Sequence, residues 1–294
     1  MTSMKIQPFG RFTAEDMEGQ YNLRALRPDY ESVVVPDWQK RSEHARASLS
    51  CRLDIAYGAS DRQKLDFFPA SSPEKRPTLI YFHGGYWQRG DRSLYSFLAE
   101  PFVRHEVNVI LPGYDLCPAV SITTISQQAG GALAWIWRNA GELGIARDRL
   151  AVMGHSAGGH ITGMMMGTDW PSIGSDLPPD LVKAGIPISP LNLLEPLRFT
   201  TIGTALNMSE AEAARESPIN HPPTTNAPQL VVCGGRETEE FHRQADIYAA
   251  AFATPQRAIE RYVVPDCDHF DELNALADDS HTFFQKALQR AAST

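Results

Sequence analysis

Six short apolar runs constrain the fold of this chain more than any other feature of its sequence. Each run is nearly continuous in apolar residues and rich in β-branched ones, which suits parallel strands buried on both faces. The runs are TLIYF (78–82), VNVILP (107–112), LAVMG (150–154), AGIPIS (184–189), QLVVCG (229–234) and ERYVVP (260–265). Helix-like segments separate most of them, at 121–144, 157–167, 239–253 and 271–292. This alternation predicts an α/β fold, in which helices cover both faces of a mostly parallel central sheet through right-handed crossovers.

The other segments fit around a single domain that spans residues 1–294. Residues 49–58 and 64–70 flank the turn signal GASDRQ and predict an antiparallel pair of strands at one edge. Residues 1–48 are polar and predict a helical N-terminal extension. Residues 191–227 interrupt the alternation with several prolines and predict a small cap or lid insertion, for which a surface excursion without a role is the alternative.

Composition narrows the class of partner. The formal net charge is −8, which argues against nucleic acid or an anionic membrane surface as the main partner, so we expect a small molecule or another protein. No apolar run approaches the roughly 20 residues of a membrane span, and the N-terminus lacks the pattern of a signal peptide, so we expect a cytoplasmic protein. Four scattered cysteines indicate reduced thiols. The sequence leaves a homodimer open.

The segment Gly154-His155-Ser156-Ala157-Gly158 matches G-x-S-x-G, between a predicted strand and a predicted helix. A sharp turn there would hold the serine in a strained backbone conformation, and the flanking glycines would let neighbouring chain pass closely. The hydroxyl would then stand at a helix N-terminus, which favours developing negative charge. We interpret Ser156 as a nucleophile; a chance match on a surface loop is the alternative.

A serine needs a base and the base needs an orienting acid. His269 follows the last predicted strand, where the carboxyl edge of the sheet would bring it to Ser156. Glu237 follows the preceding strand, and the order serine, acid, histidine fits this architecture. The other acids left open are Glu239, Glu240, Asp266 and Asp268.

The stretch HGGYW (83–87) follows the first buried strand. The glycines Gly84 and Gly85 would let backbone amides turn toward the site and, with the amide of Ala157, bind an oxyanion. Tyr86 and Trp87 would then stand on the pocket wall, with plain packing under the loop as the alternative.

Taken together, these residues resemble the α/β-hydrolase family from about Leu65 onward, and more closely the kynurenine formamidases (arylformamidases) and related bacterial esterase-like proteins. The segments that carry the resemblance are HGGYW, YDLCP (114–118), GHSAGGH (154–160), EPLR (195–198), EEFHRQ (239–244) and DHFDEL (268–273). The resemblance implies an α/β-hydrolase fold. It also implies Ser156 as nucleophile, His269 as base, and Glu237 at a position where that family usually has aspartate.

We therefore expect a serine hydrolase that cleaves an aryl formamide, such as N-formylkynurenine, or a related small-acyl amide or ester. Tyr86, Trp87, Phe241 and Phe270 are the residues expected to flank an aromatic leaving group. A general short-chain carboxylesterase is the alternative, and a noncatalytic binding module on a hydrolase fold is a third. We expect no cofactor and no metal, because the sequence has no cluster of histidines and acids at ligand spacing.

Overall fold

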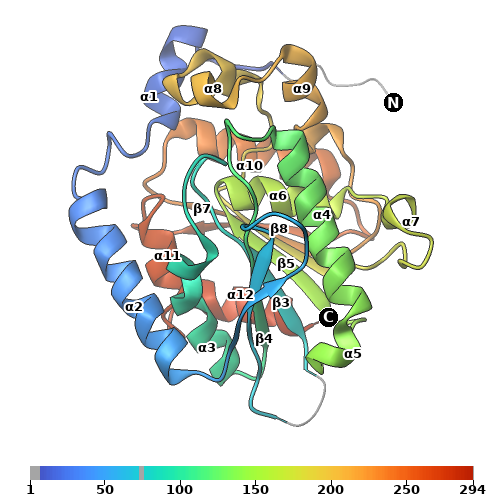
Figure 1. Ribbon diagram of the computed structural model, residues 1–294. Coiled ribbons are helices and arrows are strands. Elements are labelled where there is room, and N and C mark those ends of the chain that lie inside the picture. Colours follow the sequence, from blue (N-terminus) through green and yellow to red (C-terminus); the bar gives the residue numbers. More distant parts are fainter. Residues whose placement is uncertain (1–6, 73–75, 294) are drawn as a thin grey trace.

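The structure is a computed structural model that describes residues 7–72 and 76–293. Its centre is an eight-stranded sheet in the order β1-β2-β4-β3-β5-β6-β7-β8 (Figure 1). β1 and β2 pair antiparallel, β2 joins β4 antiparallel, and the remaining pairs are parallel. The strands are β1 (Arg52–Ala56), β2 (Lys64–Phe68), β3 (Thr78–Phe82), β4 (Asn108–Pro112), β5 (Leu150–His155), β6 (Ala184–Ile188), β7 (Gln229–Gly234) and β8 (Ile259–Val264). The predicted α/β fold with a mostly parallel sheet is confirmed.

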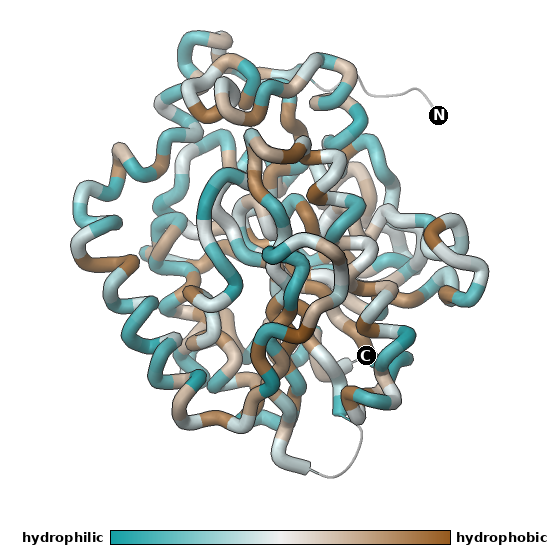
Figure 2. Tube along the Cα trace, viewed as in Figure 1, coloured by the Kyte–Doolittle hydropathy of each residue, from teal (hydrophilic) through white to brown (hydrophobic). Residues whose placement is uncertain are grey.

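Burial explains why these runs form strands. Every residue of β3, β4, β5, β6 and β7 is buried, as continuous apolar runs require, whereas the edge strands β1 and β8 are mostly exposed or half-buried. Figure 2 shows the hydropathy along the Cα trace, in which hydrophilic and apolar residues alternate along the helices at the outside of the molecule.

Helices flank the sheet. The longer ones are α2 (Val35–Ser48), α3 (Ala99–Arg104), α4 (Ile122–Arg138), α6 (Ala157–Met166), α10 (Glu239–Phe252), α11 (Asp271–Leu276) and α12 (Thr282–Ala292), with the short α5 (Ala140–Leu143) and α7 (Trp170–Ile173). α4 packs on α6, and α3 packs on α12 through the rings of Phe102 and Phe284. The predicted helix at 271–292 is two helices, because Asp278 accepts hydrogen bonds from Ser280 and the His281 side chain caps α12.

The N-terminal residues and residues 191–227 meet above the sheet. The first contain η1 (Ala14–Asp16), α1 (Met17–Tyr21), the π-type turn η2 (Tyr30–Val34) and α2; the second contain η4 (Glu195–Phe199), α8 (Thr201–Leu206), α9 (Glu210–Arg215) and η5 (Pro218–Asn220). α1 contacts η4, and Figure 1 shows α1 beside α8. Glu18 accepts hydrogen bonds from both the amide and the hydroxyl of Thr201. Residues 1–6 of the predicted extension lie outside the described residues.

The carboxyl ends of the parallel strands define one edge. β5 ends at His155, β7 at Gly234 and β8 at Val264, while η3 (Arg92–Leu98) follows the loop after β3. Ser156, Glu237 and His269 therefore all follow the carboxyl end of a strand. All four cysteines are free thiols. Within residues 7–72 and 76–293, no helix has both the length and the apolar character to cross a membrane.

Candidate active site

The turn from β5 into α6 holds Ser156 in a strained conformation. Its backbone has φ 58° and ψ −116°, in the region that side chains rarely adopt. The flanking glycines are required by close backbone contacts: a Cβ on Gly154 would lie 2.2 Å from Gly158 O, and one on Gly158 would lie 1.9 Å from Phe82 O. The amide of Ser156 donates to Ile188 O at 2.9 Å. The sequence therefore forces a tight, rigid turn with the serine at its apex.

The predicted acid and base contact each other. His269 Nδ1 donates to Glu237 Oε1, and Glu237 Oε2 accepts from the amide of Gly234 and the thiol of Cys233. Burial alone would raise the pKa of Glu237, but the neighbouring imidazole and these hydrogen bonds lower it to about 2. Glu237 is thus an ionised carboxylate that fixes the tautomer of His269 and leaves Nε2 as its free ring nitrogen.

The alternative acids are engaged elsewhere. Glu239 pairs with Arg11, Glu240 with Tyr21 and Arg243, and Asp268 with Arg27. Among the described residues, no hydrogen bond or ion pair joins Asp266 to His269, whose Nδ1 is bound by Glu237.

Ser156 and His269 line one cavity of about 40 Å³. Among the described residues, His269 bonds with Glu237 and His155, and no hydrogen bond joins it to Ser156. Catalytic hydrogen bonds are often long in free enzymes and tighten when substrate binds.

The glycine loop after β3 lies against Ser156. A Cβ on Gly84 would lie 2.9 Å from His155 O and 3.2 Å from Ser156 Cβ, and Gly85 has φ +114° with Arg89 O at 2.3 Å from its Cβ position. Neither glycine amide donates a hydrogen bond among the described residues. The amide of Ala157 is the first of α6 and has no partner in the helix ladder. The oxyanion-binding role expected of these three amides stays a prediction.

Of the four aromatic residues expected on the pocket wall, Tyr86 and Phe270 line the cavity. Trp87 does not. Both Tyr86 and Trp87 have left-handed backbone angles, φ 52° and 55°, so the chain turns and carries the indole into the core, edge-on to His160 at 4.9 Å. Phe241 is also fully buried, and its ring supports His269 from behind at 4.9 Å. Trp87 and Phe241 therefore lie outside the lining of this cavity, and their contact with substrate stays a prediction.

The N-terminal segment supplies walls that the sequence did not reveal. Leu23, Arg24, Tyr30 and Trp38 line the cavity, and the Tyr30 ring lies 4.4 Å from that of Phe270. No residue of 191–227 lines this cavity, although Ile202 lines a neighbouring one. The one sequence feature that could have indicated this wall is the presence of the aromatic residues Tyr30 and Trp38 in an otherwise polar N-terminal stretch.

A second cavity of about 90 Å³ shares Leu23, His269 and Phe270 with the first. Its polar walls are Arg27, Arg236, Glu237, Thr238 and Asp268, with Leu23, Leu26, His269 and Phe270. Arg27 binds Asp268 and Asp271, so the N-terminal segment is held against the loop that carries the base.

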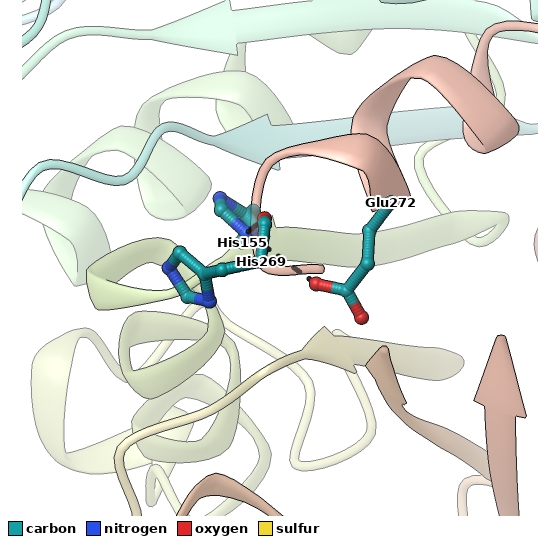
Figure 3. A group of neighbouring side chains, drawn as sticks. All are labelled: His155, His269 and Glu272. Atoms are coloured by element: carbon teal, nitrogen blue, oxygen red, sulfur yellow. Dashed lines mark hydrogen bonds and ion pairs between the residues drawn. The ribbon is translucent and has the colours of Figure 1, made fainter. Parts of the chain in front are cut away.

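Three buried groups also gather where the sequence showed no cluster. One potential ligand atom from each of His155, His269 and Glu272 lies within 4.8 Å of the others, with Glu272 extending from α11 (Figure 3). His155 Nε2 donates to His269 O at 2.8 Å, so that nitrogen is already occupied. His155 and Glu272 were not anticipated, because nothing in their spacing relates them to each other.

Comparison with known proteins then decides the family. A family model described as the alpha/beta hydrolase fold matches residues 79–270. The chain belongs to the α/β-hydrolase fold family. This α/β-hydrolase is 28% identical to a kynurenine formamidase of Danio rerio over 94% of its length and 95% of the relative's.

Solved structures extend this comparison. A putative thioesterase from a Silicibacter species superposes with a TM-score of 0.81 at 29% identity, covering 95% of this α/β-hydrolase and 99% of that chain. Esterase B from Lactobacillus rhamnosis superposes with a TM-score of 0.69 at 15% identity, covering 95% and 96% of the two chains, and so shares the fold.

Proposed function

We propose that this protein is a serine hydrolase that cleaves an aryl formamide, such as N-formylkynurenine, or a closely related amide or ester with a small acyl group. The observation that carries the proposal is the Glu237–His269 pair beside Ser156, which sits on a strained turn in the same cavity. Similarity to a kynurenine formamidase along nearly the whole chain supports the choice of substrate.

The proposed reaction begins when Ser156 Oγ attacks the formyl carbon and His269 Nε2 takes its proton. Amides of the glycine loop and of Ala157 stabilise the oxyanion, a contribution of about 3 kcal/mol for one good donor. His269 then donates its proton to the departing aryl amine, because an amine leaves poorly unless protonated. Water, deprotonated by His269, attacks the formyl-serine ester and releases formate.

Positive charge in the cavity lining supports a substrate that carries a carboxylate. Arg24 lines both the Ser156 cavity and a neighbouring cavity of about 60 Å³ that also contacts Gln88 and Arg89. Arg24 pairs with the exposed Glu31, and no ion pair among the described residues engages Arg89. The amino-acid carboxylate of N-formylkynurenine would find two guanidinium groups there, and its aryl ring would pack on Tyr30 and Phe270.

The test is turnover of N-formylkynurenine and of a panel of short-chain aryl esters by wild-type and Ser156→Ala protein. We expect formate release by the wild type and none above background by the variant. A fluorophosphonate probe should label the wild type and not Ser156→Ala; absence of labelling together with absence of turnover would favour a noncatalytic binding module. We expect turnover to survive prolonged chelation, and activity lost to a chelator and restored by zinc would contradict the serine mechanism.

A short-chain carboxylesterase is the second candidate. The small cavity beside Ser156 is lined mainly by apolar and aromatic groups, which accept an acetyl as well as a formyl group. The ratio of kcat/KM for N-formylkynurenine and for p-nitrophenyl acetate separates the two functions, and a large ester preference would favour the esterase.

A further inference from the structure

A second buried carboxyl lies behind the acid of the site. Glu272, in the first turn of α11, is fully buried. The Ser189 hydroxyl stands between the two carboxyl groups, 2.5 Å from Glu237 Oε2 and 2.7 Å from Glu272 Oε2. Ser189 follows β6 with φ 45°, and its amide donates to Val232 O at 2.9 Å, so its position is fixed by the backbone.

Counting protons shows that one of the two carboxyl groups must be protonated. A hydroxyl carries one hydrogen and can donate it to one acceptor. With both contacts at hydrogen-bond distance, the second requires a hydrogen on the carboxyl oxygen, donated to Ser189 Oγ. If both carboxyl groups were ionised, one buried carboxylate oxygen would face a lone pair of Ser189 Oγ without a hydrogen between them. Such an unpaired contact between buried acceptors is unfavourable.

The surroundings identify Glu272 as the protonated group. Glu237 accepts from His269, Cys233 and the Gly234 amide, all of which favour a carboxylate. Glu272 Oε1, in contrast, is buried with no hydrogen-bond partner among the described residues.

Among the described residues, no lysine or arginine forms an ion pair with Glu272. His155 Nε2 lies 3.6 Å from Glu272 Oε2, but that nitrogen donates to His269 O instead. Burial lowers the pKa of His155 to about 3, so this imidazole is neutral at physiological pH. Burial and the charge of Glu237 raise the pKa of Glu272 well above its ordinary value. Glu272 also interacts electrostatically with other titratable groups around it, namely Arg261, Asp268, Cys233, Cys267 and Tyr81. Arg261 forms its own ion pair with Asp246.

We propose that Glu272 is a neutral carboxylic acid that donates to Ser189, so that Ser189 donates to Glu237 and holds this carboxylate in the orientation that His269 needs. Glu272 and Ser189 are positioning residues, because both act through Glu237. An ionised Glu272 would compete with Glu237 for the Ser189 hydrogen and would repel it. The inference rests on the serine-hydrolase activity proposed above.

The experiment compares Glu272→Gln, Glu272→Leu, Ser189→Ala and the Ser189→Ala/Glu272→Leu double variant. A glutamine amide can donate to Ser189 without charge, so we expect Glu272→Gln to keep kcat for p-nitrophenyl acetate within about threefold of wild type. Removing a group that orients a catalytic residue typically costs about 10- to 100-fold, so we expect Glu272→Leu and Ser189→Ala to lose that much in kcat with KM unchanged. The double variant should lose no more than either single one, because both residues act through one chain of hydrogen bonds.

Glu216→Leu is the matched control. Glu216 is a buried carboxylate that accepts from Thr123 and Ser126, on the side of α4. Removing the Glu216 carboxylate should lower the melting temperature without lowering kcat. This control therefore shows whether a loss of stability alone lowers kcat. Wild type should also show an infrared band of a protonated carboxyl at neutral pH that is missing in Glu272→Gln, and this band needs no enzyme activity.

Several outcomes overturn the inference. If kcat fell as much in Glu272→Gln as in Glu272→Leu, the site would need the negative charge of an ionised Glu272. Unchanged kcat in Ser189→Ala would remove the positioning role, and absence of the infrared band would remove the protonated state. Should Glu272→Leu fail to fold, Ser189→Ala and the infrared band still decide. Failure of the proposed function is distinguishable, because wild-type protein would then neither turn over the esters nor react with a fluorophosphonate.

Discussion

The sheet edge and the N-terminal segment that covers it are built by different means. At the edge, backbone contacts at the glycines flanking Ser156 leave no room for a single added carbon, and Glu237 accepts four donors. The covering segment, Leu23–Trp38, is held by packed rings and by ion pairs such as Arg27–Asp268. For the proposed reaction, the comparison teaches that the edge would fix the geometry of the reacting groups, while the cover would set which substrates, by shape and charge, reach them. Changes at the edge should therefore affect kcat, and changes in the cover should affect selectivity.

Ser156→Ala should have the largest effect. Loss of a catalytic serine lowers kcat by about 10⁶-fold, because the covalent route disappears. Formate release and ester hydrolysis measure this loss, and Ser48→Ala, an exposed serine at the end of α2, is the control that should keep full activity. Substantial turnover by Ser156→Ala would contradict the assignment of Ser156 as the nucleophile, and with it the role given to the sheet edge.

Glu237→Gln should be next, with a loss in kcat of about 10⁴-fold, because an amide in place of the carboxylate favours the wrong tautomer of His269. Glu239→Gln is the matched control, since Glu239 is two residues away and pairs with Arg11 at the surface. Steady-state kinetics on one ester measure both. Equal losses in the two variants would mean that the acid has been misassigned.

The same carboxylate should make stability depend on pH. Because the pKa of Glu237 is about 2, the unfolded chain binds more protons than the folded one between that value and the ordinary pKa of about 4.5. Its contribution to stability is therefore present above pH 4.5 and is lost as the pH falls toward 2, by up to about 3 kcal/mol. Urea unfolding across this window should show a steeper decline in wild type than in Glu237→Gln, and parallel declines would contradict the assignment.

The edge could be predicted from the sequence because its constraints are local. A buried strand, a G-x-S-x-G turn and a helix follow one another in the chain, and parallel strands bring their carboxyl ends together whatever the loops do. Chain order then placed Glu237 and His269 beside the serine turn. The directions of Tyr86 and Trp87 could not be predicted, because two successive left-handed residues send neighbouring rings to opposite surroundings.

The cover could not be predicted for a different reason. Its contacts join residues more than 200 positions apart, such as Tyr30 with Phe270 and Arg27 with Asp268, and no local pattern encodes such pairs. The prolines in 191–227 predict a cap or lid there, yet none of its residues lines the Ser156 cavity. The positions of Ser189 and Glu272 beside Glu237 could not be predicted either, because a serine after a strand and a glutamate in a helix have no distinguishing spacing.

Tyr30→Leu tests the cover directly. The Tyr30 ring lines the cavity and contacts Phe270, and an aromatic pair contributes about 1 kcal/mol beyond simple burial. We expect kcat/KM to fall about tenfold for N-formylkynurenine and to change less for a small alkyl ester. Phe199→Leu is the control from the other segment, because residue Phe199 is 47% exposed and its ring packs on Phe9. A selectivity change in Phe199→Leu as large as in Tyr30→Leu would assign the cover to 191–227.

Arg24→Ala should have the smallest effect and the most selective one. Its guanidinium lies over the Tyr30 ring and lines the cavity, so it can meet a substrate carboxylate as the aryl group enters. Because a half-exposed ion pair is worth about 1 kcal/mol at most, kcat/KM for N-formylkynurenine should fall about fivefold. The methyl ester of N-formylkynurenine, which lacks the carboxylate charge, should lose no turnover in this variant, and Arg11→Ala, an exposed arginine paired with Glu239, should change turnover of neither substrate. Added salt should reduce the difference between the two substrates in wild type and leave the variant unchanged, because screening acts on the charge and not on the aromatic walls. A loss shared equally by both substrates would show that Arg24 holds the cover in place and does not select charge.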